Sequence, residues 1–230
     1  VFTEGREQHG EDAARAMLRS SLGAVGLVLT LVSALCIFGA PWIVRAFAFG
    51  FVDNLHKLGV TILLTRIMML FFITTGLTAL AMGVLNTCRH FAAPSLAPVL
   101  LNAVIITTVL AGTPMVRDWG YEAITSAACG VLLGGVAQVL LQFPFLARHG
   151  MLVVPSIDLR HPGVVRVARL MIPAVFGLAI YEINVILARQ LASFLPEGSI
   201  SYLYYAQRLI EFPMGIFAVA VATVAMPSLS

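Results

Sequence analysis

Six long apolar runs dominate the chain, and short polar connections separate them. Each run reaches or approaches the roughly 20 residues that an α-helix needs to cross about 30 Å of hydrocarbon at 1.5 Å per residue. The runs lack the in-out alternation of barrel strands, and lipid offers no partner to unpaired backbone groups. The pattern therefore predicts an all-α bundle with six membrane-spanning helices, at residues 20–44, 59–86, 94–111, 123–146, 170–195 and 201–227.

The composition supports the same class. Hydrophobic residues make up 60% of the chain, charged residues 11%, and the mean hydropathy is +0.96. Soluble domains are near 45–50% apolar and about 25% charged. The chain has too few polar residues to cover a water-soluble fold, and we expect a multi-pass membrane protein. It opens on VFTEG and stops after MPSLS, as expected of a fragment of a longer protein.

The basic residues of the connections predict the orientation. One set of alternating connections (1–19, 87–93 and 147–169) holds eight arginines and the opposite set holds three basic residues. The positive-inside rule places the richer set in the cytoplasm. The arginines are scattered without interleaved aromatics, which argues against a nucleic-acid partner. The two sets are Arg6, Arg15, Arg19, Arg89, Arg148, Arg160, Arg166 and Arg169, against Arg45, Lys57 and Arg117.

Other motifs indicate packing more than chemistry. Cys36, Cys88 and Cys129 lie in or beside different apolar runs, and the histidines form no HxxxH or HExxH pair, so we expect no metal or cofactor. No nucleophile and base are paired either, so the sequence does not predict an enzyme. Small residues at 130–135, with Gly76, Ala79 and Gly83, predict close helix contacts. Prolines inside the spans could bend the helices for gating, or could be an ordinary feature of packed membrane helices.

Charged residues inside the spans are the strongest functional signal. A charge at the bilayer centre costs roughly 2.5 to 3.5 kcal/mol on insertion scales, so such residues usually face a bundle interior or a wet cavity. Arg66, Arg189 and Arg208 each lie six or seven residues from the predicted outer end of a span, about 10 Å deep. If these three arginine side chains converge, they would form a cationic chamber suited to binding phosphate. Snorkelling of each arginine to the interface is the alternative.

Four further polar residues complete the candidate substrate-binding set. Glu182 lies seven residues before Arg189 and Glu211 three residues after Arg208, so each pair shares a helix face. Each pair could be a structural bridge, or could open to admit an anion or a coupling cation. Gln138 and Gln142, four residues apart, could line the same cavity or could join neighbouring helices.

Around these residues the sequence resembles a known family. Residues 198–217 (GSISYLYYAQRLIEFPMGIF) and 222–230 (ATVAMPSLS) are similar to the eighth transmembrane helix of the MurJ/MviN lipid II flippases. Shorter matches run through the rest of the chain in the same order. They are VFTE (1–4), QHGE (8–11), APW (40–42), GVLNT (83–87), FAAP (91–94), PVLLN (98–102) and HGMLVVP (149–155).

The resemblance implies a fragment of a transporter with fourteen helices in two lobes around a central cavity. Residues 1–19 would be a cytoplasmic amphipathic or loop segment, and 20–146 four helices of the N-terminal lobe. Residues 147–169 would be the cytoplasmic connection between the lobes, and 170–230 the first two helices of the C-terminal lobe. The fragment alone is then not expected to transport.

The implied function is movement of lipid II, the undecaprenyl-pyrophosphate-linked peptidoglycan precursor, across the bacterial inner membrane by alternating access. Arg208 matches the family's helix 8 cavity arginine. Membrane lipids and a coupling cation are further candidate partners.

The sequence departs from the family pattern at two places. Met69-Leu70 stands where relatives often have Phe-Pro, which weakens the case for a hinge there. Ala188 stands where some relatives carry an acidic cation ligand, which puts sodium coupling in doubt. A cation-coupled drug or metabolite antiporter and a non-transporting scaffold for cell-wall enzymes remain alternatives.

Overall fold

The computed structural model describes residues 2–51 and 53–213, and every regular element in this part of the chain is helical. Five of the helices are long and apolar enough to cross a membrane. A further helix begins at residue 199 and is described as far as residue 213. The all-α class and the first five predicted spans are therefore confirmed, whereas the sixth, 201–227, extends outside the described residues. The other elements are α1 (Phe2–Phe47), the 3₁₀ turn η1 (Phe49–Phe51), α2 (Leu55–Thr87), α3 (Ala92–Asp118), α4 (Ile124–Arg148) and α5 (Pro162–Ala192).

Helix α1 begins at Phe2, well before the first apolar run at residue 20, so the polar segment before the run is helical too. The Arg15 guanidinium lies 3.5 Å from Glu11 Oε2 and 3.6 Å from Asp12 Oδ1, so ion pairs about one helical turn apart stabilise this polar part. Gly10 interrupts the helix with φ of 83° and ψ of 179°. This backbone conformation is accessible to glycine without steric cost. The first span therefore continues directly from a polar helix that starts after Gly10.

Helix α5 begins at Pro162, eight residues before the predicted start of its span at 170. The His161 Nδ1 atom accepts a hydrogen bond of 3.2 Å from the Gly163 backbone amide, which caps the helix. Proline fits the first helical position because its missing amide would have no partner there. The connection between α4 and α5 is thus residues 149–161, shorter than the predicted 147–169.

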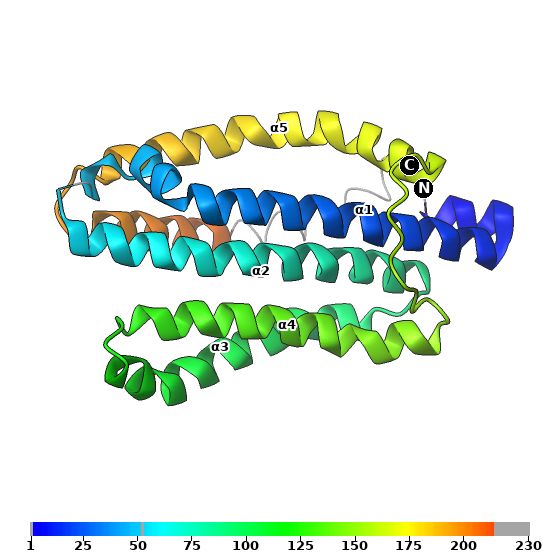
Figure 1. Cartoon of the computed structure of the whole chain (residues 1–230), viewed down its shortest axis with the longest axis horizontal. Coiled ribbons are helices and arrows are strands. Elements are labelled where there is room, and N and C mark those ends of the chain that lie inside the picture. The colour runs from blue at the N-terminus through cyan, green and yellow to red at the C-terminus, as the bar shows by residue number, and fades with distance from the viewer. Residues whose placement is uncertain (1, 52, 214–230) are drawn as a thin grey trace.

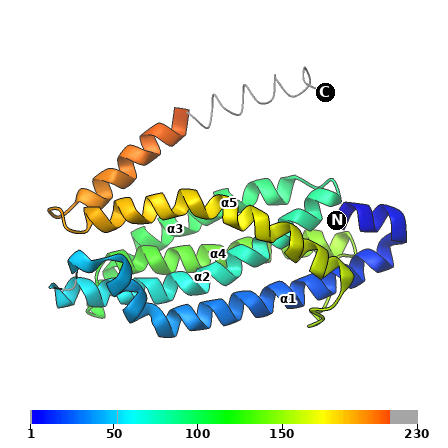
Figure 2. The same cartoon turned by 90° about the horizontal axis from the view of Figure 1, so that it is seen from above.

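The first four helices form one unit, which we call the N-terminal bundle. Helix α4 packs against α3 and α2, and α2 packs against α1. Helix α5 lies along α1 on the outside of this bundle (Figure 1). The 199–213 helix then turns away from the bundle (Figure 2). The two helices after the 149–161 connection are therefore much less embedded than the first four.

The bundle has two ends, which we name from the predicted orientation. The inner end carries the connections 88–91 and 149–161, and the outer end carries 48–54, 119–123 and 193–198. A buried cluster fills the inner end, and it includes Met151 from the connection itself. Large apolar side chains such as Phe38, Leu110 and Leu140 are exposed along the spans, as expected where hydrocarbon replaces water. The members of the cluster are Leu18, Ala81, Val84, Leu85, Ala93, Leu146 and Met151.

Small residues bring α4 close to its neighbours, as the sequence predicted. A Cβ atom added at Gly134 would lie 2.6 Å from Leu101 Cδ1 and 3.1 Å from the Leu101 carbonyl oxygen on α3. A Cβ at Gly135 would clash with Thr74 and Phe71 on α2. Gly83 differs, since apart from its chain neighbours and the backbone of its own helix, no atom of the described residues lies within 4 Å of the place that a Cβ would take there. The packing interpretation is confirmed for the α4 glycines and not for Gly83.

Candidate functional site

A groove of about 630 Å³ lies between the second half of α5 and the 199–213 helix. The chain reverses between them in residues 193–198. Gly198 has φ of +94°, which favours glycine, and the Ser193 hydroxyl donates to the Gln190 carbonyl at 2.7 Å to end α5. The reversal sets the two helices at an angle (Figure 2), and the groove lies between them.

Three charged side chains from the predicted set line this groove. Glu182 and Arg189 come from α5, and Glu211 comes from the 199–213 helix. The shared face predicted for Glu182 and Arg189 is therefore confirmed. The rest of the lining mixes small, aliphatic and aromatic residues with Gln207, so the groove offers both charge and apolar surface.

Arg208 lies beside the groove and is held by two residues that line it. Its Nε atom donates to the Tyr204 hydroxyl at 3.2 Å, and its Nη1 atom lies 3.0 Å from Glu211 Oε2. The guanidinium carbon is 5.2 Å from the centroid of the Tyr204 ring, within the range of a cation–π contact. The shared helix face predicted for Arg208 and Glu211 is confirmed, and the two side chains form an ion pair.

This arrangement orients the guanidinium without saturating it. A guanidinium carries five N–H donors in a planar fork, and Tyr204 and Glu211 use two of them in the described part of the chain. The Arg208 side chain is 62% exposed, so its remaining donors are accessible. A planar fork with free donors suits bidentate binding of a phosphate or carboxylate.

Tyr204 and Gln207 are site residues that the sequence interpretation did not single out. Tyr204 lies one helical turn before Arg208, and the Gln207 amide donates to Glu211 Oε1 at 3.3 Å. The spacing of i to i+4 between a phenol and an intramembrane arginine was the available signal. Glu211 thus accepts hydrogen bonds from two side chains of its own helix, which fixes its position at the groove.

Arg66 is not brought to this groove. It lies on α2, and its Nε atom donates to the Ile37 carbonyl of α1 at 3.3 Å. Its side chain is therefore engaged within the N-terminal bundle, away from the Arg189 and Arg208 side chains. A role for Arg66 in substrate binding stays a prediction.

Gln138 and Gln142 make the contacts expected if these glutamines join neighbouring helices. Both are buried within the bundle, at 7% and 0% exposure. The Gln138 amide donates to the Ala97 carbonyl of α3 at 2.9 Å. The Gln142 amide lies 3.5 Å from the Thr78 carbonyl of α2, and its Oε1 atom has no partner among the described residues. These contacts join α4 to α3 and α2, and they are separate from the groove.

We predict opposite stability effects for the two glutamines in the full-length protein. Gln138→Met should lower the free energy of unfolding by about 0.6 kcal/mol, the average for interhelical hydrogen bonds in membranes. Gln142→Met should leave it unchanged or raise it, because a buried oxygen without a partner costs about 1–3 kcal/mol. Thermal unfolding in detergent measures both. A loss of transport with unchanged stability would instead support a role in lining the cavity.

The fold and the groove define a class, namely a multi-pass helical membrane protein with a charged site between two of its helices. A family model described as Lipid II flippase MurJ matches residues 1–230. The chain therefore belongs to the MurJ family, and the resemblance seen in the sequence is confirmed.

Individual relatives agree with this assignment. The Lipid II flippase MurJ of Burkholderia cenocepacia is 36% identical, with all of this chain and 45% of that protein covered. The Probable lipid II flippase MurJ of Vibrio cholerae is 38% identical, with 100% and 44% covered. The corresponding protein of Haemophilus influenzae is 36% identical, with 100% and 46% covered. The relatives are named as flippases, which are transporters, and the chain spans less than half of their length.

Proposed function

We propose that the full-length protein containing this chain moves lipid II from the cytoplasmic to the periplasmic leaflet of the bacterial inner membrane by alternating access. The match to the MurJ family over the whole chain carries this proposal. In this scheme residues 20–146 contribute four helices of the N-terminal lobe. Residues 147–169 connect the lobes on the cytoplasmic side, and 170–230 begin the C-terminal lobe.

The geometry of Arg208 supports a contact with the pyrophosphate. Lipid II carries two linked phosphate groups, which match the guanidinium fork in charge and in hydrogen-bonding geometry. Glu211 balances the Arg208 charge at 3.0 Å, which lowers the cost of a charge at this depth. A bound phosphate would compete with Glu211 for the guanidinium. Arg189, Glu182 and Gln207 line the groove for the more polar parts of the headgroup.

Complementation with a leaflet assay tests the proposal. The full-length protein is expressed in a bacterium whose own lipid II flippase can be depleted, and lipid II is exposed to an added enzyme that cleaves it only at the outer surface. We expect both growth and cleavage to be restored. Growth without restored cleavage would support the scaffold alternative, and ion-dependent drug efflux without cleavage would support the antiporter.

A further inference from the structure

Helix α5 is attached to the N-terminal bundle near its two ends. Between these ends it is largely exposed, and no residue of its most apolar stretch is buried in the described structure. At the inner end, a Cβ atom added at Gly163 would lie 2.9 Å from Met17 Cγ. At the outer end, the residue after α5, Ser193, contacts Gly50 in η1. Within the described residues, α5 therefore meets the bundle at two small junctions.

The outer junction consists of two polar contacts. The Gly50 amide donates to the Ser193 hydroxyl at 3.2 Å, and the two backbones are so close that a side chain at Gly50 would clash with the Ser193 carbonyl. Lys57 Nζ lies 3.6 Å from Glu197 Oε1 and 4.3 Å from the centroid of the Phe51 ring. We call these two contacts, Gly50 to Ser193 and Lys57 to Glu197, the outer clasp.

The inner junction is anchored by the chain segment that leads into α5. The Arg15 Nε atom donates to the Gly150 carbonyl, and the Ser156 amide donates to the Arg19 carbonyl, both at 3.0 Å. Met151, between them, is 1% exposed. Residues 149–156 are therefore fixed along α1, and only residues 157–161 separate them from the start of α5.

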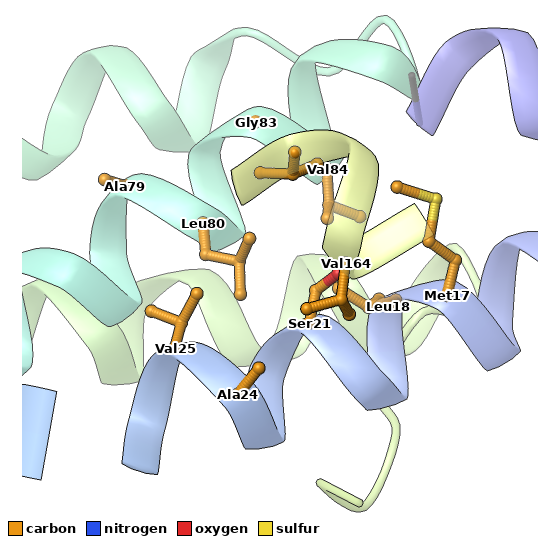
Figure 3. A pocket seen from close by; sticks show the side chains of 11 residues that line it. Met17, Leu18, Ser21, Ala24, Val25, Ala79, Leu80, Gly83, Val84 and Val164 are labelled. Carbon is orange, nitrogen blue, oxygen red and sulfur yellow. The ribbon is translucent and has the colours of Figure 1, made fainter. Parts of the chain in front are cut away.

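The packing of the first turns of α5 permits rotation. Val164 and Val167 border an apolar cavity of about 230 Å³ with Met17 and Leu18 of α1 and Leu80 of α2. Figure 3 shows Met17, Leu18, Leu80 and Val164 around this cavity, with the Val164 side chain directed toward α1. Apolar contacts beside a cavity have no directional bonds to break when one helix tilts against another.

The outer clasp is the weaker junction. The Lys57 and Glu197 side chains are 37% and 87% exposed, and exposed ion pairs contribute little to stability. The inner junction combines two hydrogen bonds to backbone carbonyls with a buried methionine and a covalent connection of five residues. If α5 moves relative to the bundle, its outer end should separate first.

We propose that the outer clasp is a releasable contact that opens during transport, while α5 pivots about residues 157–161. This inference rests on the proposed function only in that a transporter must rearrange its lobes. Residues 149–156 stay with the N-terminal bundle in this movement. Gly50 and Ser193 provide the close fit of the closed state, and Lys57 and Glu197 add a charge pair that water can readily replace.

Matched cysteine tethers test the clasp in the full-length protein with its native cysteines removed. Lys57→Cys with Glu197→Cys, joined by a short bis-thiol reagent, should stop lipid II translocation, and a cleavable reagent should restore it on reduction. The control is His56→Cys with Glu122→Cys, whose parent side chains lie 3.4 Å apart at the same end but entirely within the N-terminal bundle. Joining the control pair should leave translocation intact. Normal translocation with the Lys57 and Glu197 positions joined would overturn the proposal.

A labelling experiment tests the same movement without reference to the cargo. Ser193, 6% exposed, is changed to cysteine and treated with a membrane-impermeant maleimide. Lys57→Glu should speed the labelling by about 1.5- to 5-fold, the factor that corresponds to an exposed ion pair, and adding Glu197→Lys should reverse the effect. Labelling that follows these charges in a protein that moves no lipid II would keep the clasp and reject the proposed function. Labelling that ignores them would reject the clasp.

Discussion

Changing Arg208 to alanine is expected to reduce lipid II translocation by about 10- to 150-fold, the factor that corresponds to losing a hydrogen bond to a charged group. The change removes the guanidinium held by Tyr204 and Glu211 at the groove. It also leaves the Glu211 carboxylate without its countercharge, which disfavours an anionic guest. The measurement is cleavage of lipid II at the outer surface of flippase-depleted cells that carry the full-length variant, with its membrane level checked by blotting.

Two other variants separate the chemistry of Arg208 from its charge alone. Arg208→Lys keeps the charge but loses the planar fork, so it should restore only part of the activity. Arg117→Ala removes an exposed arginine in the last turn of α3 that does not line the groove, and should remain active. Wild-type translocation by Arg208→Ala at normal expression would contradict the assigned role.

The number and position of the first five spans could be predicted because membrane helices obey a length and hydropathy rule. Their ends could not, because polar capping and ion pairing decide them. The pairing of Arg15 with Glu11 and Asp12 extends α1 into a polar segment. The cap from His161 starts α5 eight residues early.

The sequence predicted which candidate site residues on one helix lie together, but it predicted much less well which residues on different helices do. The fixed period of the α-helix places Glu182 with Arg189 and Arg208 beside Glu211, as the structure shows. Depth along a span does not determine which way a side chain points around the helix axis. Arg66 and Arg189 were predicted at similar depth, yet Arg66 contacts α1 whereas Arg189 lines the groove.

Close helix packing gives the largest expected effect on stability. Changing Gly134 to leucine should lower the free energy of unfolding of the full-length protein by about 1–3 kcal/mol or more, the range for overpacked cores. The added side chain would press on the Leu101 backbone, whose carbonyl oxygen and Cα lie 3.1 and 3.3 Å from the position of a Cβ at Gly134. A helix backbone cannot give way as a flexible side chain can. Thermal unfolding in detergent, followed by loss of the monodisperse peak in size-exclusion chromatography, measures the effect.

Gly83→Leu is the matched control, because it makes the same chemical change in another apolar helix, near the C-terminal end of α2. Apart from its chain neighbours and the backbone of its own helix, no described atom lies within 4 Å of the Cβ position there, so the substitution should change the unfolding temperature little. It also replaces a poor helix former with a good one, which favours the folded state. Equal losses for the two variants would mean that glycine is needed for a reason common to both helices. A loss confined to Gly134 would locate the tight contact between α3 and α4, on which the rigidity of the N-terminal bundle as a platform for α5 depends.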